Sequence, residues 1–209
     1  MQPAPGDWSL HARHIWEVAS EENQAVHEYV TNWLAWSFQH PGERAGVAFV
    51  MRGGQGIGKG ILAQSWLRIF GANGHHIVDP GDLVGKFNGR QAYSLAVYAD
   101  EALYAGDKKI EGVLKARITE STKRVEWKFA DSVTMRNRDK IMMATNHDWA
   151  VPMDADDRRY FVTDVSPRYK GRKDYFDPLV QACADHKVLG AWPNLTGSAL
   201  RCASSPGSR

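Results

Sequence analysis

The sequence predicts an α/β fold of three layers, in which helices cover both faces of a mainly parallel central sheet. Short apolar runs of strand length alternate with segments of helical periodicity. Two of these runs, Leu95–Ala99 and Ile141–Ala144, are unbroken, as expected for strands buried on both faces. Polar motifs follow the predicted strands directly. Because parallel strands end at one edge of a sheet, these motifs are expected to meet where such folds bind ligands.

The chain has 209 residues, a formal net charge of +2, and 43% hydrophobic and 24% charged residues, which is typical of one globular domain. The small net charge by itself indicates no polyanionic partner. Cys183 and Cys202 allow neither a disulfide framework nor a cysteine metal cluster, so we expect a reducing compartment, the cytoplasm of a bacterial host or its equivalent. We expect no signal peptide and no membrane span, because no long apolar run occurs.

The N-terminal segment, residues 1–44, is expected to form an arm and a helix that pack on the core. Residues 1–16 show no clear period and predict an irregular arm. Over Glu17–Gln39, apolar and tryptophan side chains recur at three- and four-residue steps, which predicts a helix with Ser20 as its cap and His40–Gly42 as its stop. A tryptophan-rich stripe more often packs in a core than forms a ligand platform.

A glycine-rich turn follows the predicted strand Ala45–Met51 and precedes the predicted helix Lys59–Phe70. Gly53 and Gly58-Lys59 have the spacing G-x-x-x-x-G-K of a P-loop. Backbone N–H groups can surround a phosphate where no side chain blocks them, the helix adds its positive end, and the lysine reaches the β- and γ-phosphates of ATP. The predicted ATP-binding residues are Gly53, Gly54, Gln55, Gly56, Ile57, Gly58, Lys59, Gly60 and Ile61.

The glycine-rich turn departs from the usual P-loop at one position. A P-loop carries Ser or Thr after the lysine to hold Mg²⁺, and this chain has Gly60 there. The cation would then depend on other groups and on water. The alternative interpretation is a glycine-rich turn that binds nothing, which the flanking strand and helix disfavour.

The second buried strand ends in a pair of carboxylates. After a short apolar piece at Ile77–Val78 and a helical turn at Leu83–Phe87, the strand Leu95–Ala99 leads into Asp100-Glu101, a Walker B pattern. Asp100 is the predicted Mg²⁺ ligand and Glu101 the predicted base that activates water. An ordinary acidic strand end is the alternative.

Residues 108–140 form a basic segment with ten basic and five acidic side chains, a net charge of +5. The pattern predicts a helix, Lys108–Glu120, followed by a hairpin whose strands are Val125–Phe129 and Val133–Met135. Aromatic side chains such as Trp127 alternate with its basic residues. This combination suits single-stranded nucleic acid, in which phosphates meet lysines and bases meet rings. A solvated hairpin with inward-packed aromatics is the alternative.

Two further strands complete the predicted sheet, Ile141–Ala144 and Tyr160–Val165. Asn146 follows the first strand, where its amide would hold the attacking water or sense the γ-phosphate, unless it is an ordinary turn residue. Arg158 and Arg159 precede the second. They would reach a neighbouring subunit's phosphates or pair with adjacent aspartates.

The C-terminal part of the chain predicts a final helix, Asp174–His186, and then a change in composition. Residues 45–190 therefore form the predicted ATPase domain. Residues 191–209 are rich in Ser, Gly, Pro and Ala and predict a disordered tail.

Together these motifs resemble those of superfamily 3 helicases of the AAA+ class, of the kind found in phage and large-virus primase-helicases. The resemblance covers roughly residues 16–180, and it depends on the content and order of several pieces. They are Gly53–Gly60, Ala99–Ala102, Leu114-Lys115 with Ile118-Thr119, Met143–Asn146 and Asp157–Arg159.

The resemblance implies an AAA+-like P-loop NTPase with ATP and Mg²⁺ as cofactors. Such proteins form ring-shaped hexamers that hydrolyse ATP between subunits and move single-stranded DNA through the pore. Asn146 matches the family's sensor asparagine, and Arg158 or Arg159 its arginine finger. The hairpin matches the pore loop, with Lys128 as the gripping residue, and a primase or another replication protein is an implied partner. The predicted DNA contacts are Lys123, Arg124, Lys128 and Phe129.

The sequence therefore predicts an ATP-dependent helicase or translocase on single-stranded DNA, acting in replication of a virus or mobile element. Two alternatives remain open. A scaffold that binds nucleotide or DNA without turnover is compatible with Gly60, and a small-molecule phosphotransferase would need an acceptor pocket and an arginine-rich lid. The predicted catalytic residues are Lys59, Glu101, Asn146, Arg158 and Arg159.

Overall fold

The computed structural model describes residues 6–79, 81–82, 85, 88–100, 108–146 and 157–192. Within these residues a five-stranded sheet has the order β2-β3-β6-β1-β7, and every neighbouring pair in it is parallel. The predicted α/β fold with a mainly parallel central sheet is confirmed. Its strands are β1 (Ala48–Arg52), β2 (Gly74–Ile77), β3 (Ala96–Asp100), β6 (Lys140–Thr145) and β7 (Tyr160–Asp164).

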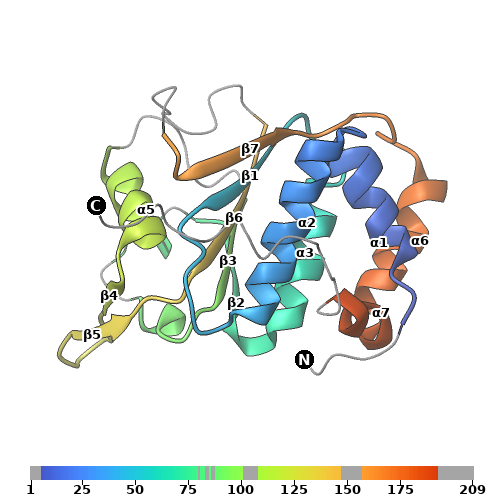
Figure 1. Ribbon diagram of the computed structural model, residues 1–209. Helices are drawn as coiled ribbons and strands as arrows, with labels where there is room; N and C mark the ends of the chain where they lie inside the picture. Colours follow the sequence, from blue (N-terminus) through green and yellow to red (C-terminus); the bar gives the residue numbers. More distant parts are fainter. Residues whose placement is uncertain are drawn as a thin grey trace.

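Helices cover both faces of this sheet (Figure 1). Strand residues alternate between the two faces, so Phe49 and Met51 pack toward α2 and α3, whereas Ala48 and Val50 pack toward α5. The three predicted layers are therefore present. The helices are α1 (Ser9–His14), α2 (Gln24–Gln39), α3 (Lys59–Phe70), α5 (Lys108–Thr119), α6 (Lys173–Ala184) and α7 (His186–Ala191).

The N-terminal segment differs from the prediction. Residues 9–19 are helical, as α1 and the π-helical turn η1 (Ile15–Ala19), so the expected irregular arm is wrong there. The following helix begins at Gln24 rather than at residue 17. Asn23 is its cap, because its Oδ1 accepts hydrogen bonds from the backbone N–H groups of the two residues beyond Gln24. Ser20 is buried and makes no such bond.

The tryptophan-rich stripe of α2 lies in the core, as predicted. Trp33 packs with its ring centroid 5.7 Å from that of Phe49 and 5.4 Å from that of Trp66. At the other end of the chain, Trp192 is fully buried and packs on Phe38. Ala191 and Trp192, which the prediction placed in the tail, are therefore buried parts of the folded chain, and residues 193–209 lie outside the described residues.

Boundaries of the other elements shift by a few residues. Of the expected apolar piece Ile77–Val78, only Ile77 belongs to a strand, as the last residue of β2, and Val78 is exposed beyond it. The sequence of β2, Gly-His-His-Ile, carries too few apolar residues to be recognised as a strand. The predicted C-terminal helix is two helices, α6 and α7, because the side chain of Asp185 accepts a hydrogen bond from the backbone of Lys187 and starts a new helix. The predicted helical turn at residues 83–87 lies mostly outside the described residues.

A two-stranded antiparallel hairpin, β4 (Thr122–Val125) and β5 (Val133–Arg136), projects from the body next to α5 (Figure 1). The hairpin was predicted, but its first strand ends at Val125 instead of starting there. Residues 126–132 form the loop between the strands. In the described part of the chain, no helix is long and apolar enough to cross a membrane.

Two buried histidines fix the N-terminal segment to the core. The Nε2 of His11 lies 3.1 Å from the Oγ of Ser65 in α3. His14 donates from Nε2 to the carbonyl of Gly58 at 3.2 Å and accepts at Nδ1 from the hydroxyl of Tyr175 at 3.1 Å. Burial lowers the pKa of each imidazole to about 4, so both rings are neutral at neutral pH.

These pKa values predict that the protein loses stability in mild acid. Between pH 6.5 and about 4 the unfolded chain binds more protons than the folded one. The contribution of the two neutral rings to the free energy of unfolding is therefore fully present above pH 6.5 and is lost as the pH falls toward 4. At pH 5 the loss should be about 2 kcal/mol per histidine. Urea unfolding at pH 7.5 and pH 5 measures this loss of stability, and most carboxylates stay ionised at both pH values.

A matched pair of variants assigns this effect to the buried rings. His14→Gln keeps a hydrogen-bonding side chain without a titrating ring, so its unfolding midpoint should depend less on pH than that of the wild type. Lys170→Ala removes an exposed cation and leaves both buried rings in place, so it should retain the wild-type pH dependence. A wild-type midpoint that is equal at both pH values contradicts the prediction.

Candidate nucleotide-binding site and basic hairpin

The glycine-rich loop connects the end of β1 to the start of α3. Gly53, Gly56 and Gly58 have φ values of 147°, 76° and 104°, which L side chains rarely adopt. A Cβ at Gly53 would lie 2.8 Å from the side chain of Ile57, and one at Gly58 would collide with the ring of His14. The backbone angles therefore favour glycine at all three positions, and close neighbours exclude a side chain at Gly53 and Gly58. These reasons add to the one predicted from the sequence, that a phosphate must be able to approach the backbone.

Lys59 is buried at the centre of the loop, although lysine side chains are usually exposed. The residue is only 7% exposed, and its ammonium donates hydrogen bonds to the carbonyls of Gly53 and Gly54, the latter at 2.7 Å. It also donates to the Oδ1 of Asn146 at 2.7 Å. A positive charge held at this point can meet the terminal phosphates of a nucleotide seated in the loop.

The sheet order brings the other predicted residues to the same place. β6 lies between β1 and β3, and its Ala144 and Thr145 pair with Asp100 and Arg52 at the ends of those strands. Asn146 follows immediately. A pocket of about 380 Å³ opens at this edge of the sheet, and Lys59, Asp100 and Asn146 all line it.

Three residues that sequence reasoning missed complete the surroundings of the pocket. Tyr98 of β3 lines it from the same face as Asp100, a position that the two-residue strand period could have indicated. Phe176 of α6 lines it from the far end of the chain, and His14 supports Gly58 from the N-terminal segment. No short-range pattern in the sequence indicates either contact.

The oxygen donors at the pocket suit Mg²⁺ held jointly with a polyphosphate. Mg²⁺ prefers one or two carboxylates, substrate phosphates and several waters to a cage made only of protein groups. Asp100 supplies a carboxylate, and Tyr98 and Asn146 supply further oxygens. Among the described residues, no group of three or more His, Cys, Asp or Glu side chains forms a metal site. Glu101, the predicted base, lies outside the described residues.

The two predicted arginines lie at the other end of the strands, where β1 and β7 begin. They precede β7, whose first residue pairs with the start of β1, and the strands place them roughly 15 Å from the pocket edge. Arg159 forms an ion pair with Asp157 at 3.2 Å, which is the alternative that the sequence left open, and Arg158 is exposed. Neither side chain is near the pocket of its own chain, so a catalytic role would require a neighbouring subunit.

Lys123 is a structural residue, and its predicted role as a DNA contact is wrong. Its side chain is 10% exposed and its Nζ donates to the Oδ1 of Asp139 at 2.8 Å, the Oγ of Ser94 at 2.7 Å and the carbonyl of Gln91 at 2.8 Å. Burial lowers the pKa of Lys123. Burial alone would raise the pKa of Asp139, but Arg117 and Lys123 together hold it below its ordinary value.

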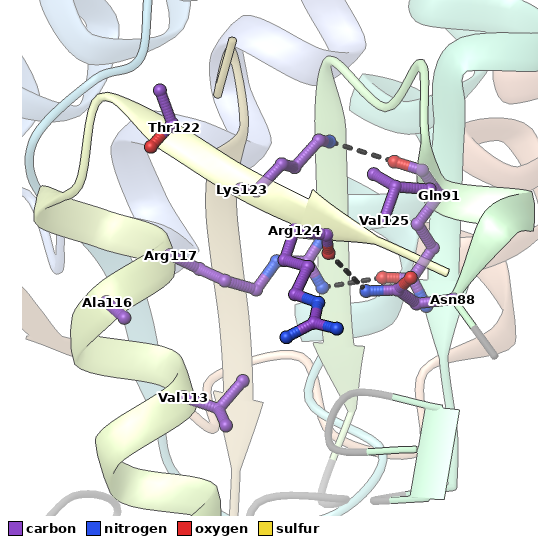
Figure 2. Close-up of a pocket in the computed structure, with 9 residues that line it drawn as sticks. All are labelled: Asn88, Gln91, Val113, Ala116, Arg117, Thr122, Lys123, Arg124 and Val125. Atoms are coloured by element: carbon purple, nitrogen blue, oxygen red, sulfur yellow. Dashed lines mark hydrogen bonds between the residues drawn. The ribbon is translucent and has the colours of Figure 1, made fainter. Parts of the chain in front are cut away.

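The base of the hairpin is anchored on residues 88–91, as Figure 2 shows. The Nδ2 of Asn88 donates to the carbonyl of Arg124 at 3.0 Å, and Arg117 donates to the Oε1 of Gln91 at 2.6 Å. These residues surround a small pocket of about 200 Å³ whose polar groups bond to one another. Trp127 packs against Gly89, where a Cβ would collide with its ring.

The end of the hairpin, in contrast, is open to solvent. Phe129 is 95% exposed and has a positive φ of 64°. The Nζ of Lys128 lies 5.2 Å from the centre of its ring. Arg124 is exposed on β4, with its Nε donating to the Oγ of Ser132 at 2.9 Å. Of the aromatics in the hairpin, Trp127 therefore packs inward and Phe129 points outward.

A family model described as a family of unknown function (DUF5906) matches residues 51–159, slightly more than half of the chain. The chain belongs to this family. The DUF5906 match includes the whole glycine-rich loop, Asp100, the hairpin, Asn146 and both arginines.

This DUF5906 protein is similar to a phage protein. A DNA primase-polymerase of Nitratiruptor phage NrS-1 is 29% identical over 138 residues, which are 65% of this chain and 19% of that protein. Two apo structures of the NrS-1 C-terminal region superpose with TM-scores of 0.77 and 0.78 at 22% identity. They cover 94% and 96% of this chain, and 47% and 48% of the solved chains. The shared fold is thus clear, and the chain spans about a fifth of the phage protein.

The two lysines of the hairpin should respond differently to substitution. Lys123→Met leaves Asp139 buried with one cation fewer, which should lower the free energy of unfolding by about 2 kcal/mol. Lys128→Met removes an exposed charge and should change it by less than about 0.5 kcal/mol. Urea unfolding of both variants measures the difference, and equal effects would contradict the structural role of Lys123.

Proposed function

We propose that this chain is the ATP-driven motor part of a viral or mobile-element replication protein, of the superfamily 3 type, and that it moves single-stranded DNA. One observation carries the proposal. A glycine-rich loop with a central lysine, a strand-end carboxylate and a strand-end amide, all at one edge of a parallel sheet, line one pocket. This combination provides phosphate binding, cation binding and water positioning together.

Each group has a distinct task in this proposal. The backbone N–H groups of residues 53–58 and the ammonium of Lys59 bind the β- and γ-phosphates. Asp100 holds the Mg²⁺ that accompanies ATP, with water and phosphate oxygens completing its shell. Asn146, already bonded to Lys59, orients the attacking water. Glu101 follows Asp100 in the chain and is our candidate for the base.

Nucleic acid would bind at the end of the hairpin. Lys128 and Phe129 combine a cation and an exposed ring, which suits a phosphate and an adjacent base. Because the hairpin is anchored at its base by a buried ionic network, its outer end is held in a fixed direction. The phage relative's name, DNA primase-polymerase, supports a role in DNA replication.

The proposed motor works as a ring, with a hexamer as the form that the resemblance implies. Arg158 and Arg159 lie far from the pocket of their own chain, as a residue that completes a neighbour's site would. Since the chain corresponds to a fraction of the phage protein, the primase activity would belong to other segments of such a protein.

A scaffold that binds nucleotide without turnover is a second candidate, because Gly60 lacks the hydroxyl that usually helps to hold Mg²⁺. The two candidates differ in phosphate release. A motor hydrolyses ATP faster in the presence of single-stranded DNA, and a scaffold does not hydrolyse it. The phosphotransferase alternative has no further support from the described residues, and it would require neither a ring nor DNA.

The nucleotide site is tested with Lys59→Ala. Without the ammonium, the terminal phosphates lose their buried positive partner, so we expect ATP hydrolysis to fall about 100-fold or more and ATP affinity to fall about tenfold. Phosphate release and fluorescent-ATP binding measure the two effects. Lys170→Ala, which removes an exposed cation, is the matched control. Unchanged turnover in a folded Lys59→Ala protein would refute the site.

The DNA contact is tested with Lys128→Ala and Phe129→Ala. Loss of one stacked ring is worth roughly 1–3 kcal/mol, so Phe129→Ala should weaken binding to single-stranded oligonucleotide about tenfold. Lys128→Ala should weaken it most at low salt and reduce its salt dependence. Fluorescence anisotropy at two salt concentrations measures both. Wild-type affinity in both variants would exclude the hairpin end as the DNA contact, and Lys170→Ala again serves as the control.

A further inference from the structure

The missing hydroxyl at Gly60 has a substitute in space. Gly60 is the second residue of α3 and faces the pocket. A Cβ built on Gly60 would lie 3.9 Å from the hydroxyl oxygen of Tyr98, which is an ordinary van der Waals distance. The phenol hydroxyl of β3 therefore lies next to the position that a Ser or Thr side chain would occupy after the P-loop lysine.

Tyr98 is also correctly placed relative to the predicted cation ligand. It stands two residues before Asp100 on β3, so the two side chains leave the same face of the sheet. Both line the pocket together with Lys59 and Gly60. The ring of Tyr98 is buried among core residues, and its hydroxyl oxygen is buried as well, beside the pocket that Tyr98 lines.

A neighbouring histidine fixes the ring further. His76 pairs with Tyr98 across β2 and β3, and their rings stack with centroids 4.8 Å apart and planes 20° apart. The Nδ1 of His76 lies 3.1 Å from the Nε2 of Gln64 in α3. Its Nε2 lies 3.9 Å from the Oδ2 of Asp100. His76 thus contacts both the phenol and the carboxylate and acts as a positioning residue for them.

We propose that the Tyr98 hydroxyl takes over the task of the absent P-loop hydroxyl and contacts the Mg²⁺ of the bound nucleotide through one of the cation's waters. A water-mediated contact suits both partners, because Mg²⁺ keeps several of its waters and a neutral phenol hydrogen-bonds readily to them. The inference rests on the proposed nucleotide site. It explains how a P-loop with glycine after its lysine can still hold a cation.

The inference predicts a specific defect in Tyr98→Phe. This variant keeps the ring and its stacking and removes only the hydroxyl. The Mg²⁺ concentration that gives half-maximal binding of a fluorescent ATP analogue should rise about tenfold, whereas binding in EDTA should match the wild type. Electron paramagnetic resonance of Mn²⁺ in the presence of ATP should show the same weakening of cation binding.

A rescue variant separates this role from a general packing effect. Gly60→Ser restores a hydroxyl at the usual position, and its Cβ meets no atom closer than the Tyr98 hydroxyl oxygen at 3.9 Å. The double variant Gly60→Ser/Tyr98→Phe should therefore regain the wild-type Mg²⁺ dependence. Tyr160→Phe is the matched control, because it removes a buried phenol hydroxyl from β7, and its Mg²⁺ dependence should not change.

The outcomes distinguish this inference from the proposed function. If the wild type binds the analogue and Tyr98→Phe shows the same Mg²⁺ dependence, the role of Tyr98 is overturned and the nucleotide site stands. The role is also overturned if Gly60→Ser fails to rescue a folded double variant. If the wild type binds no analogue with Mg²⁺ or with EDTA, both the site and the inference fail. Thermal unfolding of each variant verifies that it is folded.

Discussion

The position of β6 between β1 and β3 is the constraint on which the rest of the structure depends. All neighbouring strands in the described sheet are parallel, so their carboxyl ends share one edge, and the register aligns Asp100 and Arg52 with the last residues of β6. This arrangement allows the ammonium of Lys59, which starts a helix after β1, to bond to an amide that follows β6. If β1 and β3 were direct neighbours, with β6 elsewhere in the sheet, the amide of Asn146 would not lie beside Lys59. The pocket is a product of strand order as much as of its residues.

The same strand connects two ends of the molecule that the proposal assigns to different ligands. β5 leads through Asn137 and Asp139 into β6, and β6 ends at Asn146 beside the lysine. The segment thus runs from the anchored base of the hairpin to the pocket lined by Lys59 within about ten residues. At the hairpin end, Asp139 is held by two cations, and at the pocket end the amide bonds to a third. One strand, with a charged contact beyond each of its ends, therefore joins the base of the hairpin to the pocket.

Much of this fold follows from sequence patterns, and the departures have identifiable causes. The buried strands, α3 and the convergence of Lys59, Asp100 and Asn146 follow from apolar runs and from polar residues at strand ends. The N-terminal helix was missed because two of its core-facing positions are histidines, whose burial depends on partners far away in the chain. Lys123 was assigned to the surface for the same reason. Its partner Asp139 is 16 residues away, and charge alone does not indicate which lysine of a basic segment will be buried. The proximity of Gly60 and Tyr98 is visible only in three dimensions.

The conformation of Phe129 bears on why a ring stands at the end of the hairpin. A bulky residue with φ near 64° is strained, and Asn or Gly would adopt that angle at lower cost. The side chain is almost wholly in water, so its burial cannot compensate for the strain. Folding stability by itself would thus favour a smaller residue at this position. The ring of Phe129 therefore stands at the end of the hairpin at a cost to folding stability.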